Sequence, residues 1–183
     1  MLTIDQLFKG VEMIKFQDFR EKYSEILKAE DEEKERFQQV AEMIVRHFEK
    51  SLDLEHPGYS SPFGGNLKDP AEDAMPLPYV SIVTEKGGRH IEFNELKPDE
   101  KGVLSFCVCL IVDKSLISYP KKTLSSRLLL RRNGDGFTVT VGEDALETDL
   151  SKSPSEAELA GISEAAKHVM LIELSSGTPK RKC

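Results

Sequence analysis

One face of two predicted neighbouring strands carries the side chains best suited to binding chemistry in this chain. Because side chains alternate between the two faces of a strand, two arginines and a leucine share a face on the first strand, and two threonines continue it on the second. The members of this face are Arg127, Leu129, Arg131, Thr138 and Thr140. A guanidinium group can bind a carboxylate or a phosphate through two parallel hydrogen bonds. We therefore treat this face as the candidate binding surface.

The distribution of charge along the chain points to the same region. Residues 103–142 hold six basic and two acidic residues, although the whole chain has a net charge of −7. A mixed face of this kind fits a solvated surface, a protein partner that is acidic where it meets the arginines, or a small anionic ligand. Sheet surfaces that read RNA stack bases on aromatic side chains, and this face has none. Among functions, a protein partner is favoured and nucleic acid is not expected.

A second group of residues predicts an alternative site. His90 and Glu92 alternate on one side of a predicted strand, at a spacing that could support acid–base chemistry. Cys107 and Cys109 share one face of another strand. A cavity lined by these four residues would lie between the sheet and the loop at 53–77. Alternation on a strand is equally explained by a polar face in contact with water, so we expect no catalytic residue.

The cysteines predict buried thiols rather than a metal site. Cys107 and Cys109 lie two residues apart on a strand, which is poor geometry for a disulfide. No second pair of Cys or His residues stands at ligand spacing. Cysteine outside disulfides is among the most frequently buried residue types. We therefore expect neither a metal nor a cofactor.

Composition and motifs narrow the function further. A pI near 5.2 argues against a general nucleic-acid-binding protein. No apolar run approaches the roughly 18 residues that would span a bilayer, and the N-terminus lacks the basic and apolar regions of a signal peptide. No dinucleotide-binding, Walker, nucleophile-elbow or zinc-protease motif is present. These observations predict a cytoplasmic chain without membrane attachment and favour a role other than catalysis.

The first third of the chain, residues 1–52, is predicted to be a helical layer. Apolar residues recur at helical spacing in three stripes, of which the second covers 16–27 and the third covers 37–48. The acidic run at 30–35 is expected to open a new helix, because acids at a helix N-terminus complement the helix dipole. The first helix is expected to begin at residue 4.

The middle of the chain predicts a long loop followed by a sheet. Residues 53–77 contain four of the nine prolines, which interrupt both helix and sheet. Beyond them, short links and the turn signals at 87–88 and 133–136 indicate strands that pair with their neighbours in an antiparallel meander. The expected strands are 78–85, 88–96, 103–113, 123–132, 136–141 and 144–149.

The end of the chain predicts a helix and a tail. Ser153 and Glu156 stand at the positions of a helix cap around a proline. Apolar residues at helical spacing then favour a helix over 153–175, although 169–174 is apolar enough to form a strand. Residues 176–183 are predicted to be a disordered tail.

Together these features predict a single α+β domain over 1–175. N-terminal helices would pack on a five- to six-stranded antiparallel sheet at 78–150, followed by the C-terminal helix. Strand 103–113 is apolar on both faces, so its second face needs cover from the chain itself or from a second copy in a homodimer. The predicted function is a non-enzymatic cytoplasmic protein-binding module, such as a regulator, adaptor, chaperone or immunity-type inhibitor. The alternative is a small-molecule-binding protein or enzyme with its cavity between the sheet and the 53–77 loop.

Overall fold

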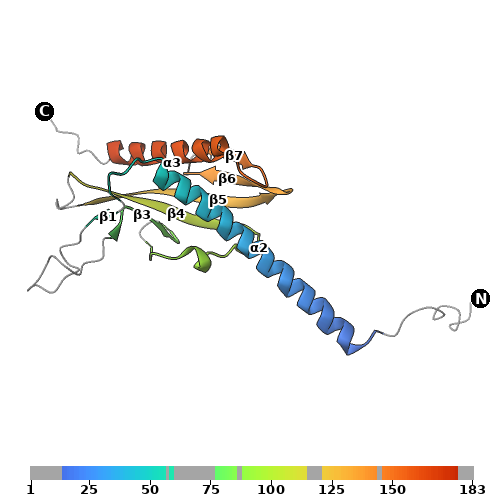
Figure 1. Ribbon diagram of the computed structural model, residues 1–183. Helices are drawn as coiled ribbons and strands as arrows, with labels where there is room; N and C mark the ends of the chain where they lie inside the picture. The colour runs from blue at the N-terminus through green and yellow to red at the C-terminus, as the bar shows by residue number, and fades with distance from the viewer. Residues whose placement is uncertain are drawn as a thin grey trace, which may run out of the picture.

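A five-stranded antiparallel sheet forms the centre of the molecule, and each of its strands pairs with the next along the chain. The computed structural model describes residues 14–56, 58–59, 77–85, 88–114, 121–143 and 146–176. The strands are β3 (Val80–Val83), β4 (Val103–Val112), β5 (Lys122–Asn133), β6 (Gly136–Val141) and β7 (Leu146–Leu150). Two helices, α2 (Phe16–Lys50) and α3 (Glu156–Ser176), complete the architecture (Figure 1). The predicted α+β class with an antiparallel meander is confirmed.

A tight turn joins β5 to β6 at the position that the sequence indicated. Asn133 pairs with Gly136 across the hairpin, and Gly134 has a φ of 57°. This left-handed conformation costs glycine little, because glycine has no Cβ atom. Gly136 meets a different constraint, since a Cβ atom there would collide with the carbonyl group of Leu150 on β7. The turn therefore sets both the β5–β6 register and the close approach of β7.

Both helices pack on the same face of the sheet. Alternate side chains of β4, β5 and β6 point to that face and form one apolar cluster with the C-terminal half of α2 and with α3. The rings of Phe37 on α2 and Phe137 on β6 meet edge to face with their centres 5.0 Å apart. The most deeply buried members are Phe37, Phe48, Phe106, Leu104, Leu128, Leu130, Val139 and Ile162. Burial of this one face supplies the main driving force for folding.

Only part of α2 belongs to this core. Its buried residues lie between Phe37 and Phe48, whereas every described residue from 14 to 33 is exposed. Figure 1 shows the N-terminal half of α2 extending beyond the sheet. The prediction that the acidic run at 30–35 opens a new helix is wrong, because α2 continues through it. No glycine or proline occurs between 16 and 50, and the residues of the run are compatible with a helix interior.

The predicted strand at 88–96 is also wrong. His90 forms one isolated bridge to Val83, and the chain then turns through the short 3-10 helix η1 (Phe93–Glu95). The Glu95 carboxylate closes this turn by accepting hydrogen bonds from the Glu92 amide at 2.9 Å and from Arg89 Nη2 at 2.8 Å. The alternating polar residues therefore belong to a turn held by a side chain, and not to a ladder of strand pairs.

Contacts from α2 hold this turn beside the helix. The Gln38 side chain donates hydrogen bonds to the carbonyl oxygens of Asn94 at 3.0 Å and Leu96 at 2.9 Å. Ile91 and Leu96 are buried in the main apolar cluster. The segment thus packs along the helix at the β3 edge of the sheet.

The two described ends of the predicted 53–77 loop pair with each other. Strand β1 (Gly58–Tyr59) lies antiparallel to β2 (Leu77–Pro78). Residues 60–76, the predicted first helix before residue 14 and the tail from 177 onward lie outside the described residues.

The helix α3 begins at Glu156 with a capping box that lies two residues later than the sequence suggested. The Ser155 amide and hydroxyl donate hydrogen bonds to Glu158 Oε2 at 2.7 and 2.6 Å, and the Ser151 amide donates to Glu158 Oε1 at 2.8 Å. These hydrogen bonds, those from Ser155 first, lower the pKa of Glu158 to about 2. Residues 169–174 are helical, in agreement with the favoured prediction.

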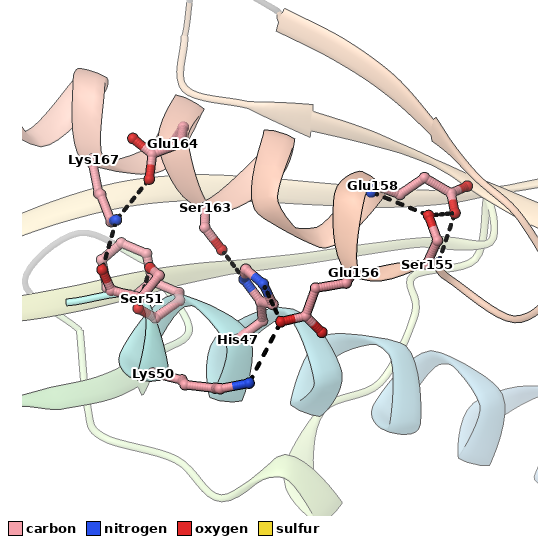
Figure 2. A network of polar contacts seen from close by, with 10 residues as sticks. His47, Lys50, Ser51, Ser155, Glu156, Glu158, Ser163, Glu164 and Lys167 are labelled. Carbon is pink, nitrogen blue, oxygen red and sulfur yellow. Dashed lines mark hydrogen bonds and ion pairs between the residues drawn. The ribbon is translucent and has the colours of Figure 1, made fainter. Parts of the chain in front are cut away.

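Polar contacts join the C-terminal end of α2 to α3 (Figure 2). His47 Nδ1 lies 2.8 Å from Ser163 Oγ, and His47 Nε2 lies 3.5 Å from Glu156 Oε1. Lys167 Nζ donates a hydrogen bond of 2.9 Å to the carbonyl oxygen of Ser51, which is the C-cap of α2. A helix C-terminus leaves carbonyl groups without intrahelical partners, and Lys167 satisfies one of them.

Replacing Phe37 by alanine should strongly destabilise the fold. The side chain is fully buried, so Phe37→Ala should lower the free energy of unfolding by about 3–5 kcal/mol. Phe19→Ala removes the same ring from an exposed position of the same helix and serves as the control. The chain has no tryptophan, so urea unfolding is best followed by circular dichroism in dilute protein. Equal losses in the two variants would contradict the assignment of the core.

Replacing Glu158 by glutamine should make the protein less sensitive to acid. Because the pKa of Glu158 in the folded protein is about 2, against an ordinary value of 4.5, its contribution to stability is complete above about pH 5 and is lost as the pH falls toward 2. Glu158→Gln should therefore be less stable than the wild type at pH 7, and the difference should shrink as the pH approaches 2. Ser155→Ala should show part of the same effect. If the wild type and Glu158→Gln differed in stability by the same amount at pH 7 and at pH 2.5, this role of Glu158 would be contradicted.

Candidate functional site

The structure brings together the five residues of the predicted binding face. In the β5–β6 register, Leu129 pairs with Thr140 and Arg131 pairs with Thr138. Arg127 lies two residues before Leu129 on β5 and therefore points to the same side. Since Leu128 and Leu130 point into the core, this face is the one opposite the helices. We call these five residues the open sheet face.

The two arginines of the open sheet face make few contacts within the molecule. Both are exposed. Arg127 Nε donates a 3.2 Å hydrogen bond to Ser105 Oγ, and Arg131 has no ion pair or side-chain hydrogen bond within the described part of the chain. Arg132 behaves differently: its guanidinium lies 5.2 Å from the centre of the Phe137 ring and its Nε lies 4.0 Å from the Glu33 carboxylate. Strand alternation thus separates structural Arg132 from the arginines that face solvent.

Arg127 and Arg131 are widely spaced on the open sheet face. They are four residues apart on the same strand, which places their Cα atoms about 13 Å from each other at 3.3 Å per residue. This spacing favours separate contacts by the two guanidinium groups. Each guanidinium can still bind a carboxylate of its own, so the geometry suits an extended partner surface better than a small anion.

Carboxylates of β7 border the open sheet face. Thr138 Oγ1 donates a 2.6 Å hydrogen bond to Asp149 Oδ1, and Asn133 Nδ2 donates to the same oxygen at 3.1 Å. These two hydrogen bonds lower the pKa of Asp149. Glu147 pairs with Thr140. The face is therefore basic along β5 and acidic along β7, a division that the linear charge count did not reveal.

A pocket of about 620 Å³ lies between the Arg127 end of this face and the end of α3. It includes Cys107 and three carboxylates, Glu85, Glu143 and Glu173. In the register of the sheet, β6 reaches β5 only as far as Leu128. Beyond that point Glu173 Oε2 accepts a 3.0 Å hydrogen bond from the Ser125 amide. A helix side chain thus satisfies part of the β5 edge that β6 leaves open.

The alternative site is divided between two places. His90 and Glu92 line a separate pocket of about 490 Å³ at the β3 edge. Cys107 lines the pocket beside Arg127, and Cys109 pairs with Ser81 within the sheet. The four residues proposed for one cavity are therefore not brought together. His90 and Glu92 instead share their pocket with Tyr59 and with residues of α2.

The 490 Å³ pocket has an unusual polar residue in its lining. Its lining includes Tyr59 and Leu77, which stand at the described ends of the predicted loop, and Ser81 of β3. The Ser81 hydroxyl is buried, and it has no hydrogen-bond partner within the residues that the structure describes. Buried polar groups normally have a partner, so this hydroxyl is an exception within the sheet. We call this cavity the β3 pocket.

Cys107 and Cys109 are buried as predicted, with 3% and 4% of their surfaces exposed. They form a small cluster with Val83. Burial, followed by the nearby Cys107 and Glu173, raises the pKa of Cys109 to about 11. A thiol with such a pKa stays protonated at neutral pH, and the protonated form is a poor nucleophile. Cover of the second face of β4 at these two cysteines is already present in a single chain.

A buried ion pair that the sequence analysis did not predict lies where β4 ends and β5 begins. Lys121 and Asp113 form a salt bridge with side chains only 8% and 11% exposed. The Lys121 ammonium lies 4.4 Å from the centre of the Tyr59 ring, and the Tyr79 hydroxyl donates to Asp113 at 3.2 Å. Burial and the Asp113 charge raise the pKa of Tyr79. Val112 pairs with Lys122, so the next residues, Asp113 and Lys121, lie opposite each other. The register of the β4–β5 hairpin was therefore the signal that could have predicted this ion pair.

The second arrangement that the sequence did not reveal resembles the geometry of a catalytic triad. His47 lies between Ser163 and Glu156 (Figure 2), and Ser–His–carboxylate contacts can activate a nucleophile. Ser163 is only 1% exposed and lies between two packed helices. A substrate cannot reach this hydroxyl in the folded protein. The contacts therefore join α2 to α3, and they are not an active site.

Comparison with known protein families, curated proteins and solved structures found no match for this chain. Within the described ranges, no cluster of three or more His, Cys, Asp or Glu side chains is placed to hold a metal ion. Neither described helix is both long and apolar enough to cross a membrane.

The buried cysteines should react slowly with a thiol reagent. At neutral pH Cys107 and Cys109 should be labelled only after unfolding, because burial restricts access to both thiols and the raised pKa of Cys109 also opposes thiolate formation. Cys183, which lies outside the described residues, is expected to react fast. Labelling with and without denaturant, counted by mass spectrometry, checks this expectation. Rapid labelling of all three cysteines in the native protein would rule out the buried assignment.

Proposed function

We propose that the chain is a non-enzymatic protein-binding module that docks a partner on the open sheet face. The observation that carries this proposal is Arg131, an exposed arginine without an ion-pair or side-chain hydrogen-bond partner within the described residues, beside half-buried Leu129 on the same strand. Arginine is enriched at protein interfaces because its apolar stem and planar charge can both be used. The module is a regulator, adaptor, chaperone or immunity-type inhibitor.

The chemistry of the face defines what a partner must offer. A carboxylate opposite Arg131 would form a bidentate hydrogen-bonded ion pair. The Asp149 and Glu147 side of the face would favour a basic or hydrogen-bond-donating group at the opposite edge of the same partner. Thr138 already donates its hydroxyl to Asp149, so the face is partly ordered before binding. The proposed partner is therefore a folded protein with an acidic region next to a polar one.

The state of the thiols and of Ser163 supports a location and a class of function. Buried thiols at Cys107 and Cys109 are compatible with a reducing compartment, and we propose that the protein works in the cytoplasm. A protonated Cys109 and an inaccessible Ser163 favour a binding role over nucleophilic catalysis.

The β3 pocket supports a second candidate, a small-molecule-binding protein. Its volume of about 490 Å³ is within the range of ligand pockets. His90 and Glu92 line the same space. The two candidates differ in what purifies with the protein: a second polypeptide for the first, and a non-covalently bound small molecule for the second.

Replacing both Arg127 and Arg131 by glutamate should abolish partner binding while leaving the fold intact. Each change turns an attraction for an acidic partner into a repulsion, and exposed charges contribute well under about 1 kcal/mol to stability. The measurement is affinity capture from the cells that produce the chain, with captured proteins identified by mass spectrometry. Wild-type capture should weaken as salt is raised, because exposed charges are screened beyond roughly 10 Å at 0.1 M salt.

A matched control separates the face from the general charge of the protein. The Lys97→Glu, Lys101→Glu variant reverses two other exposed bases and gives the same change in net charge, and it should retain the partner. Retention of the same partner by a folded Arg127→Glu, Arg131→Glu variant would show that the open sheet face is only a solvated surface.

A further inference from the structure

The exposed half of α2 carries a continuous row of large apolar side chains. Phe16, Phe19 and Tyr23 are 77%, 63% and 63% exposed, and Ile26 and Leu27 are 46% and 42% exposed. Single exposed apolar residues are common on proteins, but a contiguous apolar strip marks an interaction surface. We call these five residues the α2 stripe.

The α2 stripe continues the face of the helix that packs on the sheet. Its spacings of three and four residues follow a heptad pattern, and the same pattern reaches Phe37, Val40 and Ile44, which are buried in the core. The same side of α2 is thus covered by the sheet in the C-terminal half of the helix and exposed in its N-terminal half. The uncovered half extends past the sheet in Figure 1.

We propose that the α2 stripe pairs with the same stripe of a second copy of this chain, with the two helices antiparallel. A self-complementary contact of this kind produces a twofold-symmetric dimer. In the antiparallel register centred between residues 24 and 25, Tyr23 of each copy meets Ile26 of the other, and Phe19 meets the helix near Glu30. The dimer contact lies on α2 and leaves the open sheet face uncovered.

The charges along the helix select the second copy and the antiparallel direction. Residues 14–24 hold three basic and two acidic residues, whereas 25–36 hold six acidic and three basic residues. At 3.6 residues per turn, Arg20 and Lys22 lie on either side of the α2 stripe around the helix axis. Glu30 lies on the same side of the helix as the stripe itself. Antiparallel pairing places the basic half beside the acidic half. Parallel pairing would place the two acidic halves together, which is unfavourable.

The apolar area is sufficient for a weak dimer. An aromatic side chain buries about 150–250 Å² when enclosed, so the exposed fractions of 63–77% leave roughly 400 Å² on the three aromatic residues of one copy. Ile26 and Leu27 add to this area. Stable interfaces bury about 800 Å² per partner, which places the α2 stripe near the lower limit. The dimer should therefore dissociate in the micromolar range.

The first experiment measures the oligomeric state of the full chain. Sedimentation equilibrium between about 1 and about 200 µM protein should show a monomer–dimer equilibrium. This concentration range brackets the dissociation constant expected for an interface of this size. Phe19→Glu should raise the dissociation constant at least about 100-fold, because each dimer loses two aromatic contacts of at least about 1.4 kcal/mol. Gln17→Glu adds the same charge on the opposite side of the helix and should leave the equilibrium unchanged.

The second experiment tests the direction of the helices in a Cys183→Ser background. Oxidation of a mixture of Phe19→Cys and Glu30→Cys proteins should produce the mixed disulfide dimer, because these positions face each other in the antiparallel pair. Phe19→Cys alone should remain uncross-linked. Efficient cross-linking of Phe19→Cys to itself would establish a parallel pair and overturn the proposed geometry.

Two other outcomes would overturn the proposal itself. A monomer throughout the concentration range would show that a second copy does not cover the stripe, and that residues outside the described ranges or another partner occupy it. A dimer that is equally stable in Phe19→Glu would place the contact elsewhere. Circular dichroism of each variant confirms that the exposed substitutions leave the fold unchanged.

Discussion

Burial of one face of the sheet by two helices determines the remaining features of this molecule. Leu128 and Leu130 of β5 join Phe37 of α2 and Ile162 of α3 in one apolar cluster. Strand alternation then directs Arg127, Leu129 and Arg131 away from the helices. A helix of 35 residues is about 52 Å long, whereas five strands are only about 20 Å wide between the outer two. The helix therefore passes beyond the layer that it covers, and both exposed surfaces follow from the same packing.

Residue types that are common in active sites serve structural purposes here. His47, Ser163 and Glu156 join two helices, and Lys121 with Asp113 connects the ends of two strands beneath aromatic rings. Breaking a buried pair by removing one partner leaves an uncompensated charge and is strongly destabilising. These groups are consequently constrained by folding, and their presence does not indicate catalysis.

Much of the fold could be predicted from the sequence, because local patterns and long-range packing agree there. The Asn133–Gly136 turn and the alternation of β5 gave the correct register and the correct side for the arginines. The predicted strand at 88–96 failed because a side chain replaced a backbone partner. Glu95 accepts the hydrogen bonds that close a turn, so the alternation of His90 and Glu92 resembled a strand without forming one. The helix start was misplaced by two residues because serines and glutamates at 153–158 permit more than one capping box.

The candidate site was predictable to a similar extent. Alternation placed Arg127, Leu129 and Arg131 on one face, but it gave no information about the carboxylates of β7. Asp149 contacts Thr138 only because β7 pairs with β6. The division of the alternative site had the same origin, since His90 lies beside α2 at the β3 edge whereas Cys107 lies beside the end of α3. Such contacts between distant segments leave no spacing signal in the chain.

The overhang of α2 has a consequence for affinity. Two copies joined along their stripes would hold two open sheet faces at a fixed separation, one at each end of a helical rod about 27 Å long for the 18 residues of the paired stretch. A partner that is itself dimeric, or that repeats its acidic segment, could then engage both faces at once. The second contact would form within one complex and at a high effective concentration, which can raise the overall affinity by about 10²–10⁴-fold without any new contact. The spacing of repeats in the partner, rather than the strength of a single arginine contact, would then decide which proteins are retained.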